Sequence, residues 1–484
     1  MFALLYEFIL AAAGVASETK AHLMNNPPNE KAARLANLSA GVTSPPGKPV
    51  VLSPDEERAL LSKVTWRLIP LLFFCYIIAY IDRINVGFAK LHLREVLNVD
   101  EKIFGGVYGL GAGLFFIGYF IFEVPSNLIL QRVGARVWIA RIMIVWGIVS
   151  MGMMFIKGVT MFYVMRFLLG AAEAGFFPGV LLYLTYWFPA KERARTIALF
   201  ATGGVMAGVV GSPISGAILG MHGVGGLAGW QWLFFLEAIP AVVMGLVVLF
   251  VLPNRPQQAR WLSAPEKLWI QARLDNEAAQ PGMQQRHRLA EVFTSGRVWL
   301  LCLLYFLMNV GGYGYEMWMP TIIKGFSIKS DAVVGWINAI PYLAAGVVML
   351  LVGRHSDKTG ERRGHVAVAA ITSAVGFALS AYFKNPYLAM AALTLAFIGI
   401  KSTLGPFWAL GTTFLSGTAA AGGIALINSV GNLGGFFGPF LVGLIKDRTH
   451  DNVVALLVLG GALLMMGLLA LTIKNVPTDR AAKI

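Results

Sequence analysis

Twelve long apolar stretches recur along this 484-residue chain, and mostly short polar segments separate them. Each stretch has roughly 18 or more mainly apolar residues, enough for a helix to cross the hydrocarbon core of a bilayer. Lipid offers the backbone no hydrogen-bond partners, so we expect these stretches to be helices. A composition of 57% hydrophobic and 13% charged residues excludes a soluble globular domain. The sequence predicts an all-α integral membrane protein with twelve transmembrane helices.

The expected helices form two groups of six on either side of a longer polar segment. Their ranges are 66–90, 104–130, 136–157, 161–187, 196–220 and 231–252, then 298–323, 333–353, 365–383, 386–410, 420–445 and 453–474. The expected parts of the chain are an N-terminal tail (1–65), a first six-helix bundle (66–252), a central loop (253–297), a second six-helix bundle (298–474) and a C-terminal tail (475–484).

The first residues match the pattern of a signal peptide poorly. The apolar stretch from Phe2 to Val15 is interrupted by Glu7, and no Lys or Arg precedes it. Met24 could also serve as the initiator, so whether residues 1–23 belong to the native protein stays open.

Basic residues gather in the loops on one side of the expected bundle. The segments 132–136, 191–195, 255–297 and 354–363 are rich in Arg and Lys, and all lie on the side of the two tails. Cytoplasmic loops of membrane proteins carry this excess. We therefore expect both termini in the cytoplasm and the chain in the cell inner (plasma) membrane. The net charge of +14 follows from this topology and does not indicate a nucleic-acid partner.

The two groups of helices repeat each other at one offset. The segment 131–136 aligns with 357–362, and the same offset of 226 residues carries Gly208 onto Gly434 and Pro213 onto Pro439. A common offset at distant sites indicates a duplicated six-helix unit.

Charged residues lie inside two of the expected helices. Arg166 and Glu173 are seven residues apart, so two helical turns place them on one face. Asp82 and Arg83 lie within another apolar stretch. A charge at the centre of a spanning helix costs about 2.5–3.5 kcal/mol on insertion scales, and such residues normally face a bundle interior or a watery cavity. Two acids and two bases in one bundle indicate an ion or proton pathway.

A loop between two expected helices carries a dense motif. The segment 353–363 reads Gly-Arg-His-Ser-Asp-Lys-Thr-Gly-Glu-Arg-Arg and resembles the gating-loop motif of the major facilitator superfamily. The residues that match the motif are Gly353, Asp357, Lys358, Gly360, Arg362 and Arg363. The resemblance implies a fold of two six-helix bundles around a central cavity. The copy in the first half has Asn127 and Gln131 where the motif has Gly and Asp, so a carboxylate lock is not expected there.

Three further stretches resemble the anion:cation symporter family of that superfamily. They are 80–85 (Tyr-Ile-Asp-Arg-Ile-Asn), 166–178 and 405–435. Members carry galactonate, hexuronates, tartrate, phthalate and hydroxyphenylacetate, so the resemblance implies proton-coupled symport of a small organic carboxylate. It implies proton coupling at Asp82 and Glu173, and it implies substrate contacts from the two arginines and three matching side chains. Asn432 is expected near them as a further hydrogen-bond partner. The expected substrate-binding residues are therefore Tyr80, Arg83, Arg166, Trp408, Asn428 and Asn432.

The charges themselves suggest how an anion and a proton would be linked. Burial disfavours the charged form of a carboxylate, whereas a neighbouring arginine favours it. If Glu173 takes a proton, an arginine loses its partner and can bind a substrate carboxylate instead. A static ion-pair network that holds the two helices together is the alternative. Carboxylates serve Na⁺ as well as protons, so the coupling ion stays open, and Glu316 in the seventh expected helix has no assigned role.

Other functions are disfavoured. The chain has no Walker A, H-E-x-x-H or G-x-S-x-G motif, and its two cysteines make a thiolate metal site improbable, so we expect no enzyme, no metal and no cofactor. A drug/proton antiporter of the same fold and a non-transporting nutrient sensor remain as alternatives. The carried acid is not readable from the sequence, and a monomer is the default expectation.

Overall fold

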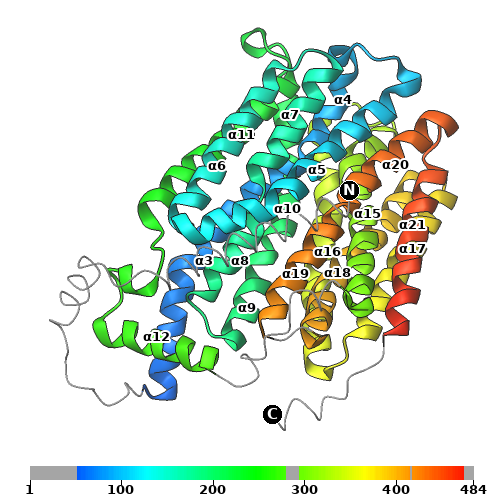
Figure 1. Ribbon diagram of the computed structural model, residues 1–484. Coiled ribbons are helices and arrows are strands. Elements are labelled where there is room, and N and C mark those ends of the chain that lie inside the picture. The colour runs from blue at the N-terminus through cyan, green and yellow to red at the C-terminus, as the bar shows by residue number, and fades with distance from the viewer. Residues whose placement is uncertain (1–51, 280–293, 415–416, 474–484) are drawn as a thin grey trace. The chain divides into compact units, whose positions relative to one another are not determined.

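The computed structural model describes residues 52–279, 294–414 and 417–473, and every regular element within these ranges is a helix (Figure 1). The described residues from Ser53 onward belong to one compact unit, which is the unit considered below. The expected tails fall largely outside the described residues. Twelve helices among the described residues are long and apolar enough to cross a membrane, which confirms the expected fold class.

The helices of the first half lie within residues 54–251. They are α3 (Pro54–Ile84), α4 (Val86–Leu97), α5 (Glu101–Val133), α6 (Ala135–Gly152), α7 (Gly158–Glu173), α8 (Phe176–Thr185), α9 (Ala190–Ala201), α10 (Gly203–Leu219) and α11 (Gly229–Val251), with short helices η2 (Met153–Phe155) and η3 (Val224–Gly226). Several expected helices are therefore divided, and the first spanning segment is longer than expected, from Pro54 to Leu97.

The second half follows a polar connection that contains η4 (Pro256–Gln258) and α12 (Ala264–Ala279). Its helices are α15 (Gly296–Lys324), α16 (Asp331–Thr359), α17 (Arg363–Tyr382), α18 (Pro386–Phe414), α19 (Gly417–Asn432), α20 (Gly434–Thr449) and α21 (Val453–Thr472). In Figure 1 they stand toward the right of the view, and most helices of the first half stand toward the left.

The break between α7 and α8 comes directly after Glu173. Gly175 adopts φ +88°, a left-handed conformation that favours glycine, and a Cβ there would collide with the side chain of Ser126. The expected helix 161–187 is thus two helices, because the backbone turns where another helix approaches closely. This break places Glu173 at a helix end inside the bundle.

Capping boxes begin the helices α3 and α12. Ser53 and Glu56 exchange bonds at the start of α3, and Ser263 and Glu266 do so at the start of α12. Lys63 of α3 also donates to both carboxylate oxygens of Glu266, each at 2.9 Å. Although partial burial acts in the opposite direction, these bonds from Lys63 and Ser263 hold the pKa of Glu266 below its usual value. The contact anchors α12 on α3.

Small residues allow helices of the two halves to approach each other closely. On α10, Gly216 faces the backbone of α16 at Asp331 and Gly335, and on α5, Gly109 faces the backbone of α20 at Pro439. Such ladders of small residues are typical of close helix packing in lipid. The two halves therefore meet along two seams, α10 with α16 and α5 with α20.

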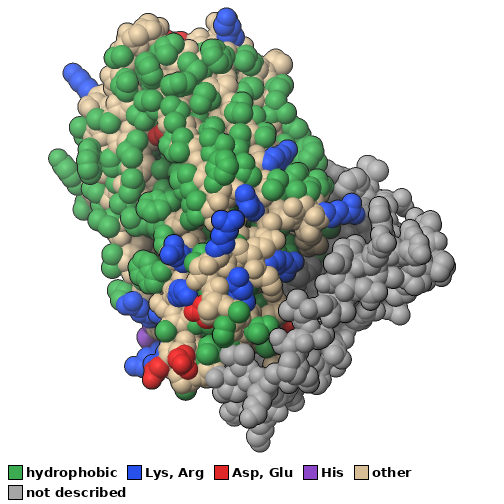
Figure 2. All heavy atoms as spheres, turned by 90° about the vertical axis from the view of Figure 1, so that its left-hand side faces the viewer, with side chains coloured by type: hydrophobic (Ala, Val, Ile, Leu, Met, Phe, Trp, Pro, Cys, Tyr) green, Lys and Arg blue, Asp and Glu red, His purple; other side chains and the backbone are tan. Residues whose placement is uncertain are grey.

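Large hydrophobic side chains cover much of the outside of the helices. Phe250, Trp336 and Val368 are each more than 60% exposed. Figure 2 shows hydrophobic side chains spread over the upper part of one face, with Lys and Arg gathered toward its lower part. An exposed apolar surface of this extent fits contact with lipid rather than with water.

Candidate functional site

A buried ion pair joins the first and fourth spanning segments of the first half. A guanidinium nitrogen of Arg83, on α3, donates to the carboxylate of Glu173 at the end of α7. Another nitrogen of Arg83 donates to the hydroxyl of Tyr313, on α15, at 3.0 Å. The rings of Phe115 and Tyr119 flank the guanidinium, each with its centre 5.4 Å from Cζ. Arg83 is thus a buried cation at the junction of the two halves.

Arg166 lies deeper in the first half and is less well satisfied. It is fully buried, and its single hydrogen bond within the described residues runs to the carbonyl of Ala112 at 3.2 Å. Its Nε and Nη1 atoms have no partner there, and the ring centre of Phe115 lies 5.1 Å from Cζ. A buried guanidinium with unmet donors is costly, so an anion or ordered water would stabilise it.

Asp82 does not neutralise either arginine by contact. Its carboxylate accepts bonds from Trp146 Nε1 at 2.8 Å and from Ser150 Oγ at 3.1 Å, both on α6. Asp82 therefore forms no ion pair with Arg83 or Arg166 within the described part of the chain. The reason is geometric: successive helical residues point about 100° apart, so Arg83 faces α7 and α15 while Asp82 faces α6.

A second buried ion pair joins α15 and α18 of the second half. Lys401 Nζ lies 2.8 Å from Glu316 Oε1, and Glu316 is only 3% exposed. Both oxygens of Glu316 also accept from Tyr80, at 2.9 and 3.0 Å, and Oε1 accepts from Tyr342 at 3.2 Å. Sequence reasoning noted Glu316 without a role and missed Lys401, although Lys401 is the single charged residue in the expected helix 386–410.

Another acidic side chain, Glu123, links the halves, and sequence reasoning missed it as well. Glu123 of α5 accepts from Asn428 Nδ2 at 2.5 Å and from Ser429 Oγ at 2.8 Å, both on α19. Glu123 follows Tyr119 by one helical turn, which places it next along α5 from the cage around Arg83. Its signal in the sequence was an acid inside the expected helix 104–130.

The other expected substrate residues lie near these contacts. Tyr80 is already in the Glu316 cluster. Trp408 of α18 meets the ring of Tyr305 edge-on, with centres 5.1 Å apart, and is partly exposed. Asn428 is engaged by Glu123, and Asn432 is buried at the end of α19. The structure thus brings Tyr80, Arg83 and Glu173 to one junction and leaves Asp82 on another face of α3.

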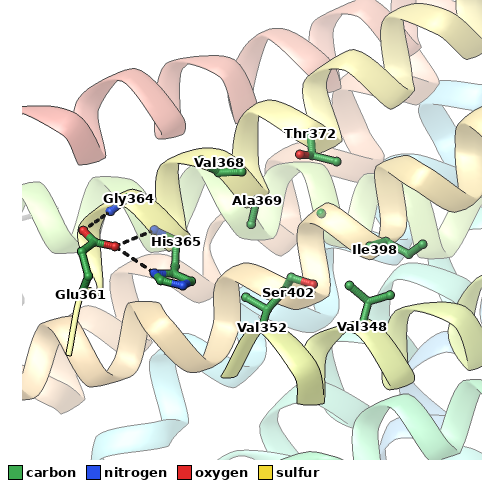
Figure 3. Close-up of a pocket in the computed structure, with 11 residues that line it drawn as sticks. Val348, Val352, Glu361, Gly364, His365, Val368, Ala369, Thr372, Ile398 and Ser402 are labelled. Atoms are coloured by element: carbon green, nitrogen blue, oxygen red, sulfur yellow. Dashed lines mark hydrogen bonds and ion pairs between the residues drawn. The ribbon is translucent and has the colours of Figure 1, made fainter. Parts of the chain in front are cut away.

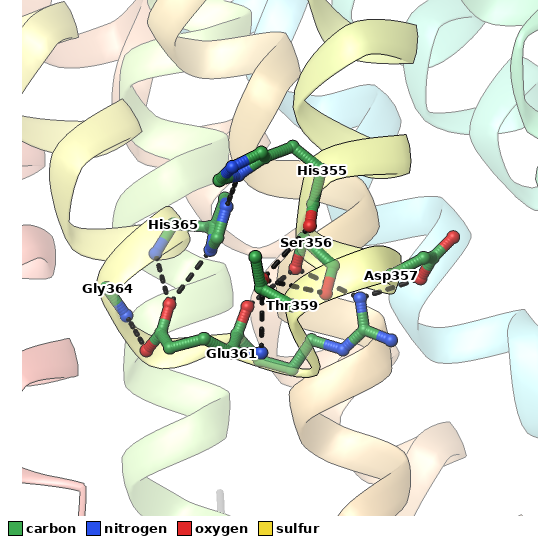
Figure 4. A network of polar contacts seen from close by, with 8 residues as sticks. His355, Ser356, Asp357, Thr359, Glu361, Gly364 and His365 are labelled. Atoms are coloured by element: carbon green, nitrogen blue, oxygen red, sulfur yellow. Dashed lines mark hydrogen bonds and ion pairs between the residues drawn. The ribbon is translucent and has the colours of Figure 1, made fainter.

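The loop motif forms a compact polar turn at the end of α16 (Figure 4). Gly360 ends α16 in a left-handed conformation, φ +69°, and Asp357 pairs with Arg362 at 2.6 Å. Arg363 donates to the carbonyl of Ile473 at 3.0 Å. Lys358 is exposed, and Gly353 lies inside α16 with open space around it. Of the two glycines, Gly360 makes the turn, and Gly353 does not.

Histidines extend this polar turn. Glu361 Oε2 lies 2.8 Å from His365 Nδ1, and His365 Nε2 lies 2.7 Å from His355 Nδ1 (Figure 4). Although burial acts to raise it, bonds from the Gly364 amide and from His365 hold the pKa of Glu361 below its usual value. The charge of Glu361 therefore helps to hold the start of α17 against the turn.

A cavity of about 310 Å³ opens next to this turn, between α16, α17 and α18 (Figure 3). Val348, Val352 and Val368 form much of its wall, and Glu361 and His365 lie at one end. None of the expected substrate residues lines it, so it is separate from the charged junction.

The chain is similar to known membrane carriers. Residues 72–439 match the family model of the Major Facilitator Superfamily. A putative tartrate transporter of Agrobacterium vitis is 47% identical over 433 residues, which cover 90% of this chain and 99% of that protein. A quinolone resistance transporter of Acinetobacter baumannii is 42% identical, with 83% of this chain and 92% of that protein covered.

Solved structures share the fold. The xylose transporter XylE from E. coli, in a partially occluded inward open conformation, superposes with a TM-score of 0.69 at 14% identity, and the match covers 85% of this chain and 98% of that one. At this identity the likeness concerns the fold alone.

Proposed function

Because this chain belongs to the Major Facilitator Superfamily, we propose that it imports a small organic carboxylate anion together with protons. Members of the superfamily are transporters and not enzymes, and the chain is a multi-pass membrane transporter with twelve candidate spans in its described residues. The anion, the proton coupling and the alternating access are the proposed part.

One observation carries the proposal. Arg83 is a buried cation at the junction of the two halves, and its carboxylate partner, Glu173, is itself titratable. An arginine binds a carboxylate with planar, charge-assisted and often bidentate hydrogen bonds. Glu173 already occupies the position that a substrate carboxylate would take, so the two anions compete for one guanidinium.

Proton coupling follows from that competition. When Glu173 takes a proton, Arg83 loses an ionised partner and becomes available to the substrate anion. The loaded site then has the same net charge as the empty one, so the anion and the proton cross together. Arg166, with two donors unmet among the described residues, adds a second positive charge behind the pair. Asp82, held by Trp146 and Ser150, is proposed as a further proton acceptor on the other face of α3.

Alternating access is proposed from the contacts between the halves. Arg83 with Tyr313, Tyr80 with Glu316, and Glu123 with Asn428 each join one half to the other. Rocking of the halves along the small-residue seams would break some of these contacts and open the site to one side. The turn formed by residues 353–363 is proposed to brace one end of the second half during this motion.

The proposal also covers the location, the oligomeric state and the coupling ion. The excess of Lys and Arg in the loops on one side supports a proposed location of both termini on the cytoplasmic side of the inner membrane. The protein is proposed to act as a monomer, with H⁺ rather than Na⁺ as the coupling ion. The tartrate-transporter relative supports a carboxylate substrate, and that substrate name belongs to the relative.

Drug export by proton exchange is the second candidate, because a relative at 42% identity is named a quinolone resistance transporter. The buried arginines favour an anion over the apolar or cationic compounds that such exporters commonly expel. Uptake measurements separate the two functions, because under the same inward proton gradient a symporter moves its substrate inward and an antiporter moves it outward.

The test is uptake into proteoliposomes under an inward proton gradient, with radiolabelled sugar acids, tartrate and aromatic acids. We expect at least one acid to accumulate, and we expect Arg83→Ala to abolish that accumulation. Arg94→Ala, at a partly exposed arginine that pairs with Glu101, should retain it. Export of dyes or quinolones without uptake of any acid would refute the symport proposal. Binding of an acid without its uptake would favour a sensor.

A further inference from the structure

The Glu316–Lys401 pair of the second half mirrors the Arg83–Glu173 pair of the first. Arg83 and Glu173 lie on the first and fourth spanning segments of their half, and Glu316 and Lys401 lie on the first and fourth of theirs. Acid and base have exchanged helices between the two halves. Each half therefore presents one buried cation, covered by its own glutamate, at the junction.

The surroundings of Glu316 amount to a receptor for a carboxylate. Lys401, Tyr80 and Tyr342 all direct polar hydrogens to its two oxygens, at 2.8 to 3.2 Å. Lys401 Nζ also lies 3.0 Å from the Tyr80 hydroxyl and 4.9 Å from the ring centre of Phe397. An ammonium with two phenols recognises any carboxylate that reaches it, and Glu316 fills that role within the chain.

The two cations are close enough to hold one small molecule. Arg83 Cζ lies 5.9 Å and Lys401 Nζ 5.3 Å from the ring centre of Tyr80. Because both distances end at the same point, the two charged groups are at most about 11 Å apart. Three C–C bonds separate the end carbons of a four-carbon diacid by about 4 Å, and hydrogen bonds of about 2.8 Å at each end fit within that span.

We propose that Lys401, with Tyr80 and Tyr342, is a second carboxylate subsite, and that the transported class is therefore short dicarboxylates. One carboxylate of the substrate replaces Glu173 at Arg83, and the other replaces Glu316 at Lys401. Each displaced glutamate takes up one proton, so a dianion enters with two protons and the charge of the site is unchanged. This inference rests on the proposed function and assigns a task to a residue pair outside the expected site.

Matched acids test the subsite directly. Threonate has the carbon chain of tartrate with one carboxylate replaced by a hydroxymethyl group, and benzoate has the ring of phthalate with one carboxylate replaced by hydrogen. Binding of all four to the purified full-length protein is measured by calorimetry. We expect the diacid of at least one pair to bind about 10- to 100-fold more tightly than its monoacid, the factor given by a hydrogen bond to a charged group.

Variants then locate the preference. Glu316→Gln combined with Lys401→Met removes both charges together, so that neither remains buried and unpaired. We expect the ratio of diacid to monoacid affinity to fall to about 1 in this double variant, to persist in Lys401→Arg, which keeps the charge, and to persist in Lys384→Met, an exposed lysine elsewhere in the second half.

The outcomes separate the two claims. Equal affinity for both members of each pair, or a double variant that keeps the diacid preference, overturns the subsite and leaves carboxylate transport at Arg83 intact. If the wild type binds none of the four acids and takes up no other acid, the proposed function fails, and this inference fails with it.

Discussion

Replacing Glu173 by Gln removes the charge that competes with a substrate for Arg83 and leaves the shape of the side chain almost unchanged. The wild-type substrate must displace an ionised carboxylate from a buried guanidinium. A hydrogen bond to a charged group contributes about 1.5–3 kcal/mol. Without that competitor, we expect the anion to bind Glu173→Gln about 10- to 100-fold more tightly at a pH where Glu173 is ionised in the wild type.

The same change removes the proton link. In the wild type, each unit of pH above the titration of Glu173 lowers the apparent affinity for the anion tenfold, equivalent to about 1.4 kcal/mol. In Glu173→Gln this dependence is absent, because no proton is taken up at that position. A gradient of two pH units could drive about 100-fold accumulation for each coupled proton in the wild type, and Glu173→Gln should lose the part of the accumulation that the proton at Glu173 drives.

Two assays check these expectations. Calorimetry at several pH values measures the affinity, and proteoliposomes with and without an inward proton gradient measure accumulation. Glu101→Gln, the same substitution at a side chain that is 83% exposed, is the matched control and should behave like the wild type. Gradient-driven accumulation at the wild-type level in Glu173→Gln would refute the coupling role of Glu173 and favour a static ion pair.

Three further substitutions test the fold around the site. Gly175→Ala should lower the stability of the protein by about 1–2 kcal/mol because of its positive φ, and further because the new Cβ collides with a neighbouring helix. Gly223→Ala, at φ +87° in open space, should lose only the part due to the positive φ. Thermal unfolding in detergent measures both losses. Gly109→Leu should abolish uptake by forcing α5 away from α20, and Gly461→Leu, which meets nothing within 4 Å, should leave uptake near the wild-type level. Because the pKa of Glu361 lies below its usual value, its charge stabilises the fold above the ordinary glutamate pKa, and that contribution disappears as pH falls through the lowered value. Glu361→Gln should therefore have a lower melting temperature than the wild type at neutral pH and the same melting temperature in acid. Equal melting temperatures at pH 7 would contradict this role of Glu361.

Apolar length and charge spacing were sufficient to predict the helices and part of the site. Lipid imposes a minimum length on each spanning stretch, so the twelve helices could be read from the chain. Glu173 was identifiable because a carboxylate inside an apolar helix needs a partner. Its contact partner is Arg83 on another segment rather than Arg166 on its own, and helical periodicity within one stretch carries no information about which neighbouring helix supplies that partner.

Contacts between the halves could not be derived from one sequence. Glu123, Glu316 and Lys401 were visible as isolated charges in apolar stretches, yet Lys401 lies 85 positions from its partner Glu316, and Asn428 lies 305 positions from Glu123. Pairing at such separations depends on how the helices pack. The break at Gly175 is a similar case, since its cause is the side chain of Ser126 on a different helix.

The most direct test of the central claim is the movement of protons with the substrate. Proteoliposomes that contain a pH-sensitive dye are prepared without any pH gradient, and a large excess of tartrate, phthalate or a sugar acid is added outside. The account predicts that at least one acid acidifies the interior, and that the signal is lost in Arg83→Ala and reduced in Glu173→Gln. Uptake of an acid with no change of internal pH, or with a requirement for Na⁺, would contradict proton symport.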